Sequence, residues 1–116
     1  MGADIGELTR DTIPTDVLEA DRPVIIDVWG PQCVPCIALS PTFERLAGEF
    51  GDRARFMKLE APKNRMACVD LKVMGLPAFL RYEGGAEVSR LTGDVDDAAL
   101  VQWVKEALAN EGGDEE

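Results

Sequence analysis

One short segment limits the folds open to this chain. Residues 24–29 read Val-Ile-Ile-Asp-Val-Trp, a largely β-branched apolar run that directly follows Pro23. Because the run does not alternate between apolar and polar residues, it predicts a strand buried on both faces of a sheet, as in a central parallel position. Gly30-Pro31 then ends the run. A strand of this kind is typical of an α/β fold, in which helices cover both faces of the sheet.

A helix is expected directly after this strand. Apolar residues recur there at spacings of three and four, which places them on one helical face. These residues are Cys36, Leu39, Phe43, Leu46 and Phe50. We expect Pro41 to kink this helix without abolishing it, and Gly51 to end it.

Shorter patterns complete an alternation of strands and helices. Further strands are predicted at residues 7–10, 55–59, 78–82 and 87–91, the last two joined by a hairpin at Gly84-Gly85. Further helices are predicted up to Leu18 with Thr15 or Asp16 as its cap, over residues 64–71, and after a capping Asp96. The apolar stripe of this last helix is Leu100, Trp103, Val104, Ala107 and Leu108. The order predicts a βαβ half and a ββα half, which form a central mixed sheet of four to five strands flanked by helices on both faces.

The length of the chain, its net charge and its first residues indicate the number of domains, the kinds of partner and the location. The 116 residues suit one domain, expected over 1–110, and residues 111–116 read as an acidic disordered tail. Acids outnumber bases by 22 to 12, a net charge of −10, which disfavours binding to nucleic acid or to membrane surfaces. The first residues carry no basic segment and no long apolar stretch, so we expect neither a signal peptide nor an anchor, and a cytoplasmic location.

The numbers of cysteines and histidines exclude several kinds of catalytic and metal site. The chain has three cysteines and no histidine, so Cys–His dyads and Ser–His–Asp triads are excluded. A zinc or rubredoxin-like iron site needs four ligands, and only Cys33, Cys36 and the distant Cys68 are available, so no metal is expected. Three cysteines also fit poorly with the disulfide framework of a small secreted fold.

The pair Cys33-Val34-Pro35-Cys36 stands where the buried strand gives way to the amphipathic helix. A thiolate at a helix N-terminus is stabilised by unpaired backbone N–H groups and by the helix dipole, and the spacing brings the second sulfur within bonding reach. Cys33 is then expected to attack a partner's disulfide, and Cys36, one turn deeper, to resolve the mixed disulfide. The alternative from the residues alone is a pair of inert buried thiols.

The segment from Val24 to Ala47 resembles the active-site segment of the thioredoxin family, and the resemblance extends from about Thr15 to Leu108. Four landmarks carry it in order: the strand end Asp27–Trp29, the Cys33–Cys36 pair, Gly75-Leu76-Pro77, and Gly93 before the last helix. The resemblance implies a thioredoxin fold and a monomeric protein-disulfide reductase with no bound cofactor beyond its redox-active disulfide. It also implies disulfide-containing client proteins and a flavin-dependent thioredoxin reductase as electron donor.

The resemblance also implies roles for single residues. Asp27 either points into solvent or, as in the family, is a buried carboxyl with a raised pKa that exchanges a proton with Cys36. Lys58 matches a lysine near that carboxylate, although a solvated lysine at a strand end fits the pattern equally well. A cis Leu76–Pro77 bond is implied, in a loop that binds extended client peptides. The substrate-binding residues implied are Trp29, Gln32, Val34, Pro35, Gly75, Leu76, Pro77 and Gly93.

Several positions depart from the family's usual Trp-Cys-Gly-Pro-Cys-Lys. Gln32 replaces an aromatic residue, Val34 a glycine and Ile37 a basic residue. Ala61-Pro62 stands where an apolar residue and an aspartate are usual. Cys-Val-Pro-Cys resembles variant members from some anaerobic bacteria, which serve dedicated reductases.

Two other functions remain open from the sequence. The fold could serve as a binding module or a dedicated subunit of one partner, with redox turnover secondary. Cys68 could instead be an oxidative sensor, since exposed third cysteines oxidise or dimerise.

Overall fold

A five-stranded mixed sheet forms the centre of the computed structural model, which describes residues 5–111. The strands are β1 (Gly6–Glu7), β2 (Val24–Trp29), β3 (Arg55–Glu60), β4 (Ala78–Glu83) and β5 (Ala86–Thr92). Their order is β1-β3-β2-β4-β5, with β1, β3 and β2 parallel and with β4 antiparallel to both β2 and β5. The mixed sheet and the central position of β2 are confirmed.

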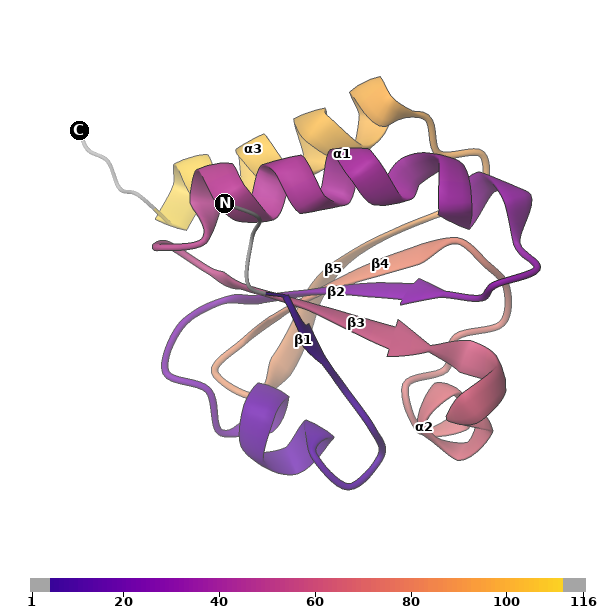
Figure 1. Cartoon of the computed structure of the whole chain (residues 1–116). Helices are drawn as coiled ribbons and strands as arrows, with labels where there is room; N and C mark the ends of the chain where they lie inside the picture. Colours follow the sequence, from indigo (N-terminus) through magenta and orange to yellow (C-terminus); the bar gives the residue numbers. More distant parts are fainter. Residues whose placement is uncertain (1–4, 112–116) are drawn as a thin grey trace.

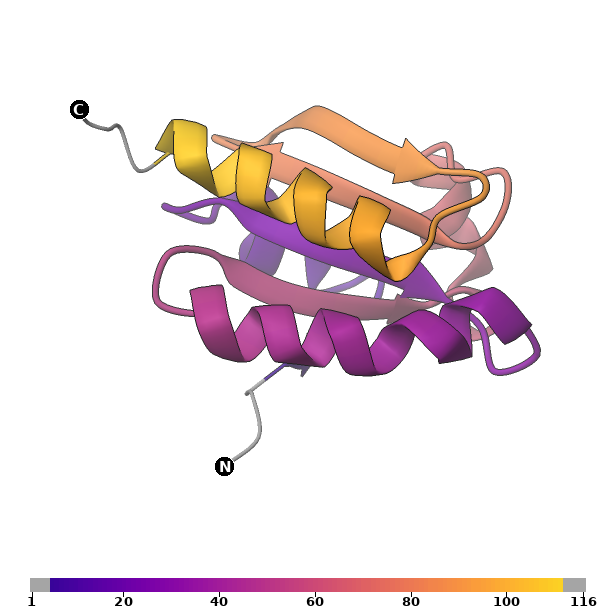
Figure 2. The same ribbon diagram turned by 90° about the horizontal axis from the view of Figure 1, so that it is seen from above.

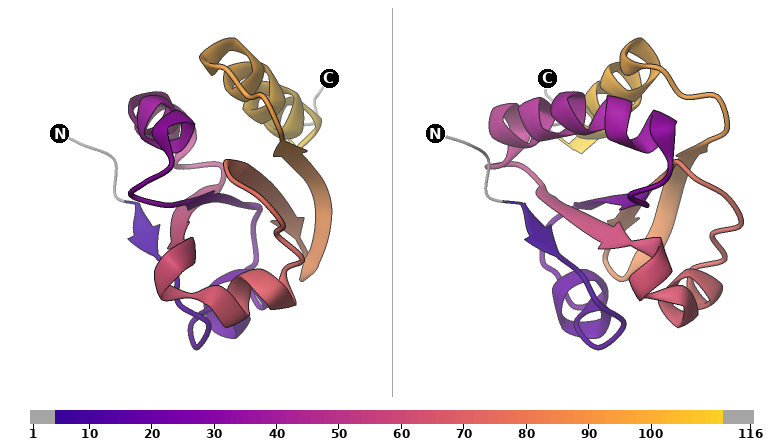
Figure 3. Two further views of the ribbon diagram at one scale, coloured as in Figure 1. Left: turned by 90° about the vertical axis from the view of Figure 1, so that its right-hand side faces the viewer. Right: turned by 45° about the vertical axis from the view of Figure 1, so that its right-hand side comes forward.

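Helices cover both faces of this sheet (Figure 1). They are η1 (Pro14–Leu18), α1 (Val34–Phe50), η2 (Ala61–Lys63), α2 (Arg65–Asp70) and α3 (Asp97–Glu111). α1 and α3 lie side by side over one face and begin at the same end of the molecule, whereas η1 and α2 lie against the other face (Figures 2 and 3). Among the helices described, none is long and apolar enough to span a bilayer.

The core lies in two layers because successive side chains of a strand point to opposite faces. Ile25 of β2 packs with Phe43, Phe79 and Leu100 beneath α1 and α3. The other layer, between the sheet and the helices η1 and α2, includes Ile26, Val28, Leu59, Leu80 and Leu71. Every residue from Val24 to Val28 is at most 1 % exposed, as a strand buried on both faces requires.

The local signals read from the sequence largely hold. α1 continues through Pro41 and ends before Gly51. The Asp96 carboxylate accepts a hydrogen bond of 2.8 Å from the backbone N–H of Ala99, which confirms it as the cap of α3. Gly84 and Gly85 have φ values of 60° and 85°, the left-handed backbone that a tight hairpin turn demands.

Two predictions near the N-terminus need correction. The first strand covers Gly6–Glu7, not residues 7–10, because the chain turns at Thr9, whose carbonyl accepts from the Thr12 N–H at 3.1 Å. The brief helix begins at Pro14, whose fixed φ suits a first helical position, and Ile13 precedes it with no side-chain cap. Neither Thr15 nor Asp16 caps it.

The C-terminal boundary shifts by one residue. Glu111, predicted to begin the acidic tail, is the last residue of α3. Residues 112–116 of the predicted tail lie outside the described residues.

Candidate active site

The two cysteines lie where β2 leads into α1. Cys33 is the residue that caps α1, and its Sγ accepts a hydrogen bond of 3.2 Å from the backbone N–H of Cys36. The two residues form a disulfide, with their Cα atoms 5.2 Å apart. Cys33 is half-buried, whereas Cys36 is only 2 % exposed. The more exposed cysteine therefore sits at the positive end of a helix, and the buried cysteine lies one turn deeper.

Asp27 is a buried carboxyl on the face of the sheet that α1 covers. It lies two residues after Ile25 on β2, so its side chain points to the same face of the sheet as Ile25, toward the core beneath α1. It is 1 % exposed, and its Oδ1 has no hydrogen-bond partner among the described residues. Burial raises the pKa of Asp27 to about 7, against a smaller lowering by the Lys58 charge. The solvent-facing reading of Asp27 is excluded.

Lys58 stands directly opposite Asp27 in the pairing of β2 with β3. Its side chain is only 16 % exposed, so it is not a solvated lysine at a strand end. The ammonium donates to Ser40 Oγ at 2.7 Å and lies 3.9 Å from the Glu44 carboxylate, both on α1. It also lies 5.4 Å from the centre of the Trp29 ring. Lys58 is thus tied to α1 and does not form an ion pair with Asp27.

Trp29 lies between the buried strand and the cysteine loop. Its ring is half-buried and receives the Lys58 ammonium on one face. Its indole Nε1 is buried and has no hydrogen-bond partner within residues 5–111. The ring contributes packing and a cation–π contact beside the cysteines.

A second loop, residues 72–77, approaches the cysteine loop. The Leu76–Pro77 peptide bond is cis, as the resemblance implied. Gly30 shows how close the two loops come, because a Cβ on it would lie 3.3 Å from Leu76 Cδ1 and 3.5 Å from Pro62 Cδ. Pro62, one of the departures noted above, therefore borders the same junction.

The predicted substrate-binding residues fall around this junction with different exposures. Gln32, Val34, Pro35, Gly75 and Gly93 are exposed, Trp29 and Leu76 are half-buried, and Pro77 is buried. A cavity of about 410 Å³ runs along the loop from Lys72 to Pro77 and reaches Thr92 and Gly93. A mostly apolar one of about 390 Å³ lies on the α2 side, bordered by Pro62, Val69 and Leu76.

Sequence reasoning missed three residues that matter here. Ser40 and Glu44 hold Lys58. They follow Cys36 by four and eight residues, and this spacing, which places them on the same face of α1, was the signal that could have identified them. Met74 is 96 % exposed. Its position directly before Gly75-Leu76-Pro77 was the only sequence feature that could have identified it as part of the site. Val34 at 78 % exposure and Met74 give the rim of the site an apolar character.

Cys68 lies away from the disulfide, on α2. It is half-buried against the core layer beneath α2, and burial raises the pKa of its thiol. A raised pKa lowers the thiolate fraction on which oxidation depends. Across the described part of the chain, no group of three or more Cys, Asp or Glu side chains is arranged to hold a metal ion.

Comparison with known proteins gives a consistent result. The family model described as thioredoxin matches residues 4–106. A thioredoxin of Acetoanaerobium sticklandii is 36 % identical over 96 residues, which cover 83 % of this chain and 91 % of that protein. A bifunctional thioredoxin reductase/thioredoxin of Mycobacterium leprae is 29 % identical over 90 % of this chain, which spans 23 % of that protein. The crystal structure of a Malassezia sympodialis thioredoxin superimposes with a TM-score of 0.81 at 22 % identity, covering 90 % of each chain.

Proposed function

This chain belongs to the thioredoxin family of dithiol–disulfide oxidoreductases, and we propose that Cys33 is its attacking thiol and Cys36 its resolving thiol. The observation that carries the proposal is the asymmetry of the pair. Cys33 is half-buried and caps α1, whereas Cys36 is 2 % exposed. Members of this family use no bound cofactor and act through their own cysteine pair.

Reduction of a client then proceeds in two exchanges. The Cys33 thiolate attacks one sulfur of a client disulfide, forming a mixed disulfide while the other client sulfur leaves as a thiolate. Cys36 loses its proton and attacks Cys33 Sγ, the bond to the client breaks, and the second client sulfur leaves as a thiolate. The client gains two electrons and, with two protons, becomes a dithiol, while the protein is left with the Cys33–Cys36 disulfide.

Asp27 is the proposed acceptor of the Cys36 proton. Burial raises its pKa to about 7, near the pH at which such a base is most effective. It shares with Cys36 the side of the sheet that α1 covers. Lys58 has the supporting role of limiting how far this pKa rises, since its charge favours the carboxylate.

The client-binding surface proposed is the rim formed by the two loops. Gln32, Val34 and Pro35 border the cysteines on one side, and Gly75, Leu76 and Pro77 approach from the other. Trp29 supports the cysteine loop and Gly93 closes the cavity of about 410 Å³ beside Pro77. We propose that an extended peptide binds along this rim through main-chain hydrogen bonds, the mode in which extended peptides are commonly recognised.

Thioredoxins generally work with a thioredoxin reductase and with disulfide-bonded clients, and we propose that this chain receives electrons from a flavin-dependent reductase. The relative that joins thioredoxin reductase and thioredoxin in one protein supports this partner. A reductant needs a compartment that keeps dithiols reduced, so the cytoplasm is the location proposed, with electron transport as the role. A radius of gyration of 13.2 Å suits one compact domain, predicted over residues 1–110 and extended by α3 to Glu111, and we propose that this domain acts as a monomer.

The test is to trap the mixed disulfide with a client. Insulin, a protein with accessible disulfides, is mixed with the reduced Cys36→Ser and Cys33→Ser variants in a Cys68→Ser background. Cys36→Ser should accumulate a covalent adduct with an insulin chain, because the attack occurs and the resolution does not. Cys33→Ser should give none. Equal adducts from both variants, or none from either, would reject the assigned roles.

A further inference from the structure

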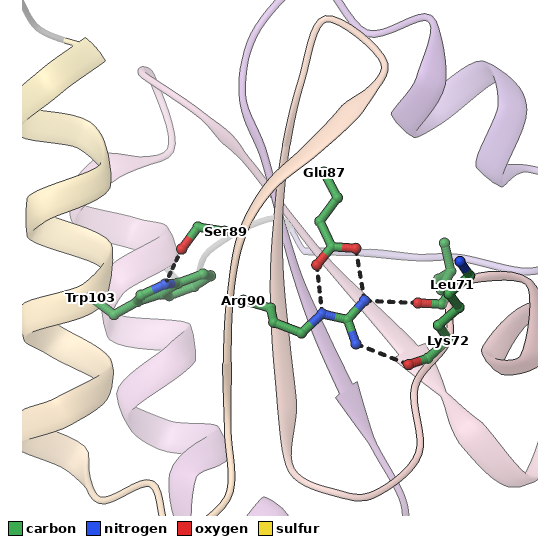
Figure 4. Close-up of polar contacts among 6 residues, drawn as sticks. All are labelled: Leu71, Lys72, Glu87, Ser89, Arg90 and Trp103. Atoms are coloured by element: carbon green, nitrogen blue, oxygen red, sulfur yellow. Dashed lines mark hydrogen bonds and ion pairs between the residues drawn. The ribbon is translucent and has the colours of Figure 1, made fainter.

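The side chain of Arg90 joins the edge strand β5 to the end of helix α2 (Figure 4). Its Nη2 donates to the carbonyl oxygen of Leu71 at 2.8 Å, and its Nη1 donates to that of Lys72 at 3.0 Å. Leu71 and Lys72 directly follow α2, and the loop that carries the cis Leu76–Pro77 bond starts from them. A strand at one edge of the sheet therefore holds the first residues of that loop.

Glu87 fixes the direction of the guanidinium. Its Oε1 accepts from Arg90 Nη2 at 2.7 Å, and its Oε2 accepts from Nε. The hydrogen bond from Arg90 lowers the pKa of Glu87, so the pair stays ionised at neutral pH. Four of the five N–H groups of the guanidinium are used, two by this carboxylate and two by the carbonyls. Such a fork holds its partners in one geometry, which a lysine ammonium cannot do.

A β-bulge makes this pair possible. Residues three apart on a regular strand point to opposite faces, so Glu87 and Arg90 would normally be separated. Here Glu87 is opposite Tyr82 and Arg90 opposite Leu80, which leaves Val88 as the extra residue. The bulge thus brings both charged side chains to the α2 side. On the other side of β5, Ser89 accepts a hydrogen bond of 2.9 Å from Trp103 Nε1 of α3, which anchors the strand (Figure 4).

The C-terminal end of α2 leaves two backbone carbonyls outside the hydrogen bonds of the helix, and the guanidinium of Arg90 binds them. Lys72 has a φ of 59°, a left-handed conformation that a residue with a Cβ adopts reluctantly. The N–H groups of Lys72 and Val73 bond back to the carbonyls of Val69 and Cys68, at 3.1 and 2.9 Å. This is the hydrogen-bond pattern of a Schellman ending, and the carbonyls of Leu71 and Lys72 lie beyond it. Arg90 binds those two carbonyls.

We propose that Arg90, oriented by Glu87, is a positioning residue that fixes loop 72–77 in the conformation that binds a protein client. The loop is held at its start by Arg90 and at its end by β4, where Ala78 pairs with Val28 and Thr92. Arg90 also lines the cavity beside Gly75 and Pro77. A loop that leaves its binding conformation loses affinity in proportion to the fraction that remains competent. The inference rests on the proposed client-binding role of this loop.

The test compares a large client with a small disulfide. Arg90→Met keeps an unbranched, flexible stem about as long as the aliphatic part of the arginine, and removes every donor. We expect the reduced variant to react with insulin about tenfold more slowly than the wild type, because the loop no longer stays in place. Its rate with the small disulfide 5,5′-dithiobis(2-nitrobenzoate), and its reduction potential, should stay at the wild-type values. Hydrogen exchange should quicken at the amides of residues 73–76.

Arg10→Met is the matched control. Arg10 also contacts α2, through an ion pair of 2.9 Å with Asp70, but it binds no carbonyl of the loop. This variant should behave as wild type in every assay. Arg90→Lys keeps the charge without the fork, and we expect it to remain slow with insulin.

Three results would overturn the positioning role: an unchanged insulin rate in Arg90→Met, an equal slowing with both disulfides, or full recovery in Arg90→Lys. The first two would show that the effect is not specific to the loop. The third would show that the several directed N–H groups of the guanidinium are not required. Hydrogen exchange distinguishes the two explanations even if Arg90→Met is less stable than Arg10→Met. A general loss of structure would quicken exchange throughout the core, whereas a loss of positioning would quicken it only in the loop. A wild type that fails to reduce insulin would instead reject the proposed function, and the positioning role with it.

Discussion

Lys58 donates a hydrogen bond to Ser40 at 2.7 Å, although Asp27 stands directly opposite it across β2 and β3. The lysine is thereby held on α1 and leaves the buried carboxyl without an ion pair. Oδ1 of Asp27 also lacks a hydrogen-bond partner among the residues described. Desolvation therefore dominates and raises the pKa of Asp27 to about 7. The molecule keeps a proton acceptor near neutral pH at a cost in stability.

That cost predicts a stabilised variant. The pKa of Asp27 rises on folding from 3.8 to about 7, so between these values the folded protein binds more protons than the unfolded chain. Its stability therefore falls as pH rises through this window. In Asp27→Asn the loss disappears, which predicts a gain on the order of 4 kcal/mol at pH 8 and almost none at pH 4. Urea unfolding of both oxidised proteins at the two pH values measures it. An equal difference at both would contradict the assignment.

Ser40 offers a way to change the pKa of Asp27 without touching the carboxyl. In Ser40→Ala the ammonium of Lys58 loses its 2.7 Å acceptor and becomes available to Asp27, with Glu44 as the competing charge and Cys36 held in the disulfide. We expect the titration midpoint of the carboxyl to fall by about one pH unit. Carbon-13 NMR of the oxidised protein follows this titration directly. Ser40→Thr retains a hydroxyl and serves as the control, and an unchanged midpoint in Ser40→Ala would show that Ser40 does not divert the lysine.

The three thiols of the reduced protein should differ in reactivity. Cys33 lies at the N-terminus of α1 and is half-buried, whereas Cys36 is 2 % exposed. Burial raises the pKa of the Cys68 thiol. Iodoacetamide at pH 7 should therefore modify Cys33 about tenfold faster than Cys68, with Cys36 slowest. Peptide mapping by mass spectrometry gives the three rates. If Cys68 reacted first, the oxidative-sensor reading of that residue would regain support.

Met74 should matter for clients and not for folding. It is 96 % exposed beside Gly75, on the loop proposed to bind the client. Met74→Ser should leave the midpoint of thermal unfolding unchanged, and slow the reaction with insulin several-fold through loss of apolar contact. Val88→Ser removes an apolar side chain that is 46 % exposed at the β5 bulge, and should have no effect on that reaction. Equal rates of insulin reduction in Met74→Ser and Val88→Ser would show that the client does not bind at Met74.

The sequence predicts elements best where one pattern dominates. The bounds of β2 follow from a largely β-branched run between Pro23 and Gly30, and the start of α1 follows from Cys33 and Pro35 at its first turn. The sequence does not predict contacts that join distant segments. The bulge at Val88 leaves no mark in the sequence, so the pairing of Glu87 with Arg90 could not be foreseen.

The candidate site divides in the same way. The cysteine pair could be expected from a local motif, whereas the cis Leu76–Pro77 bond and a buried Asp27 were expected only from the resemblance. The partner of Lys58 could not, because nothing local decides whether an ammonium turns to a carboxylate on its own sheet or to a hydroxyl on the covering helix. Tertiary packing makes that choice.

The central claim is that Cys33 and Cys36 form a redox pair poised to reduce clients. Its most direct test is the reduction potential of the pair, obtained by equilibration in defined dithiothreitol buffers followed by thiol trapping. The account predicts a single two-electron transition at roughly −270 mV, the value typical of a thioredoxin that reduces its clients. A value near the oxidising end of the scale, roughly −120 mV, or a pair that never forms a disulfide, would contradict it.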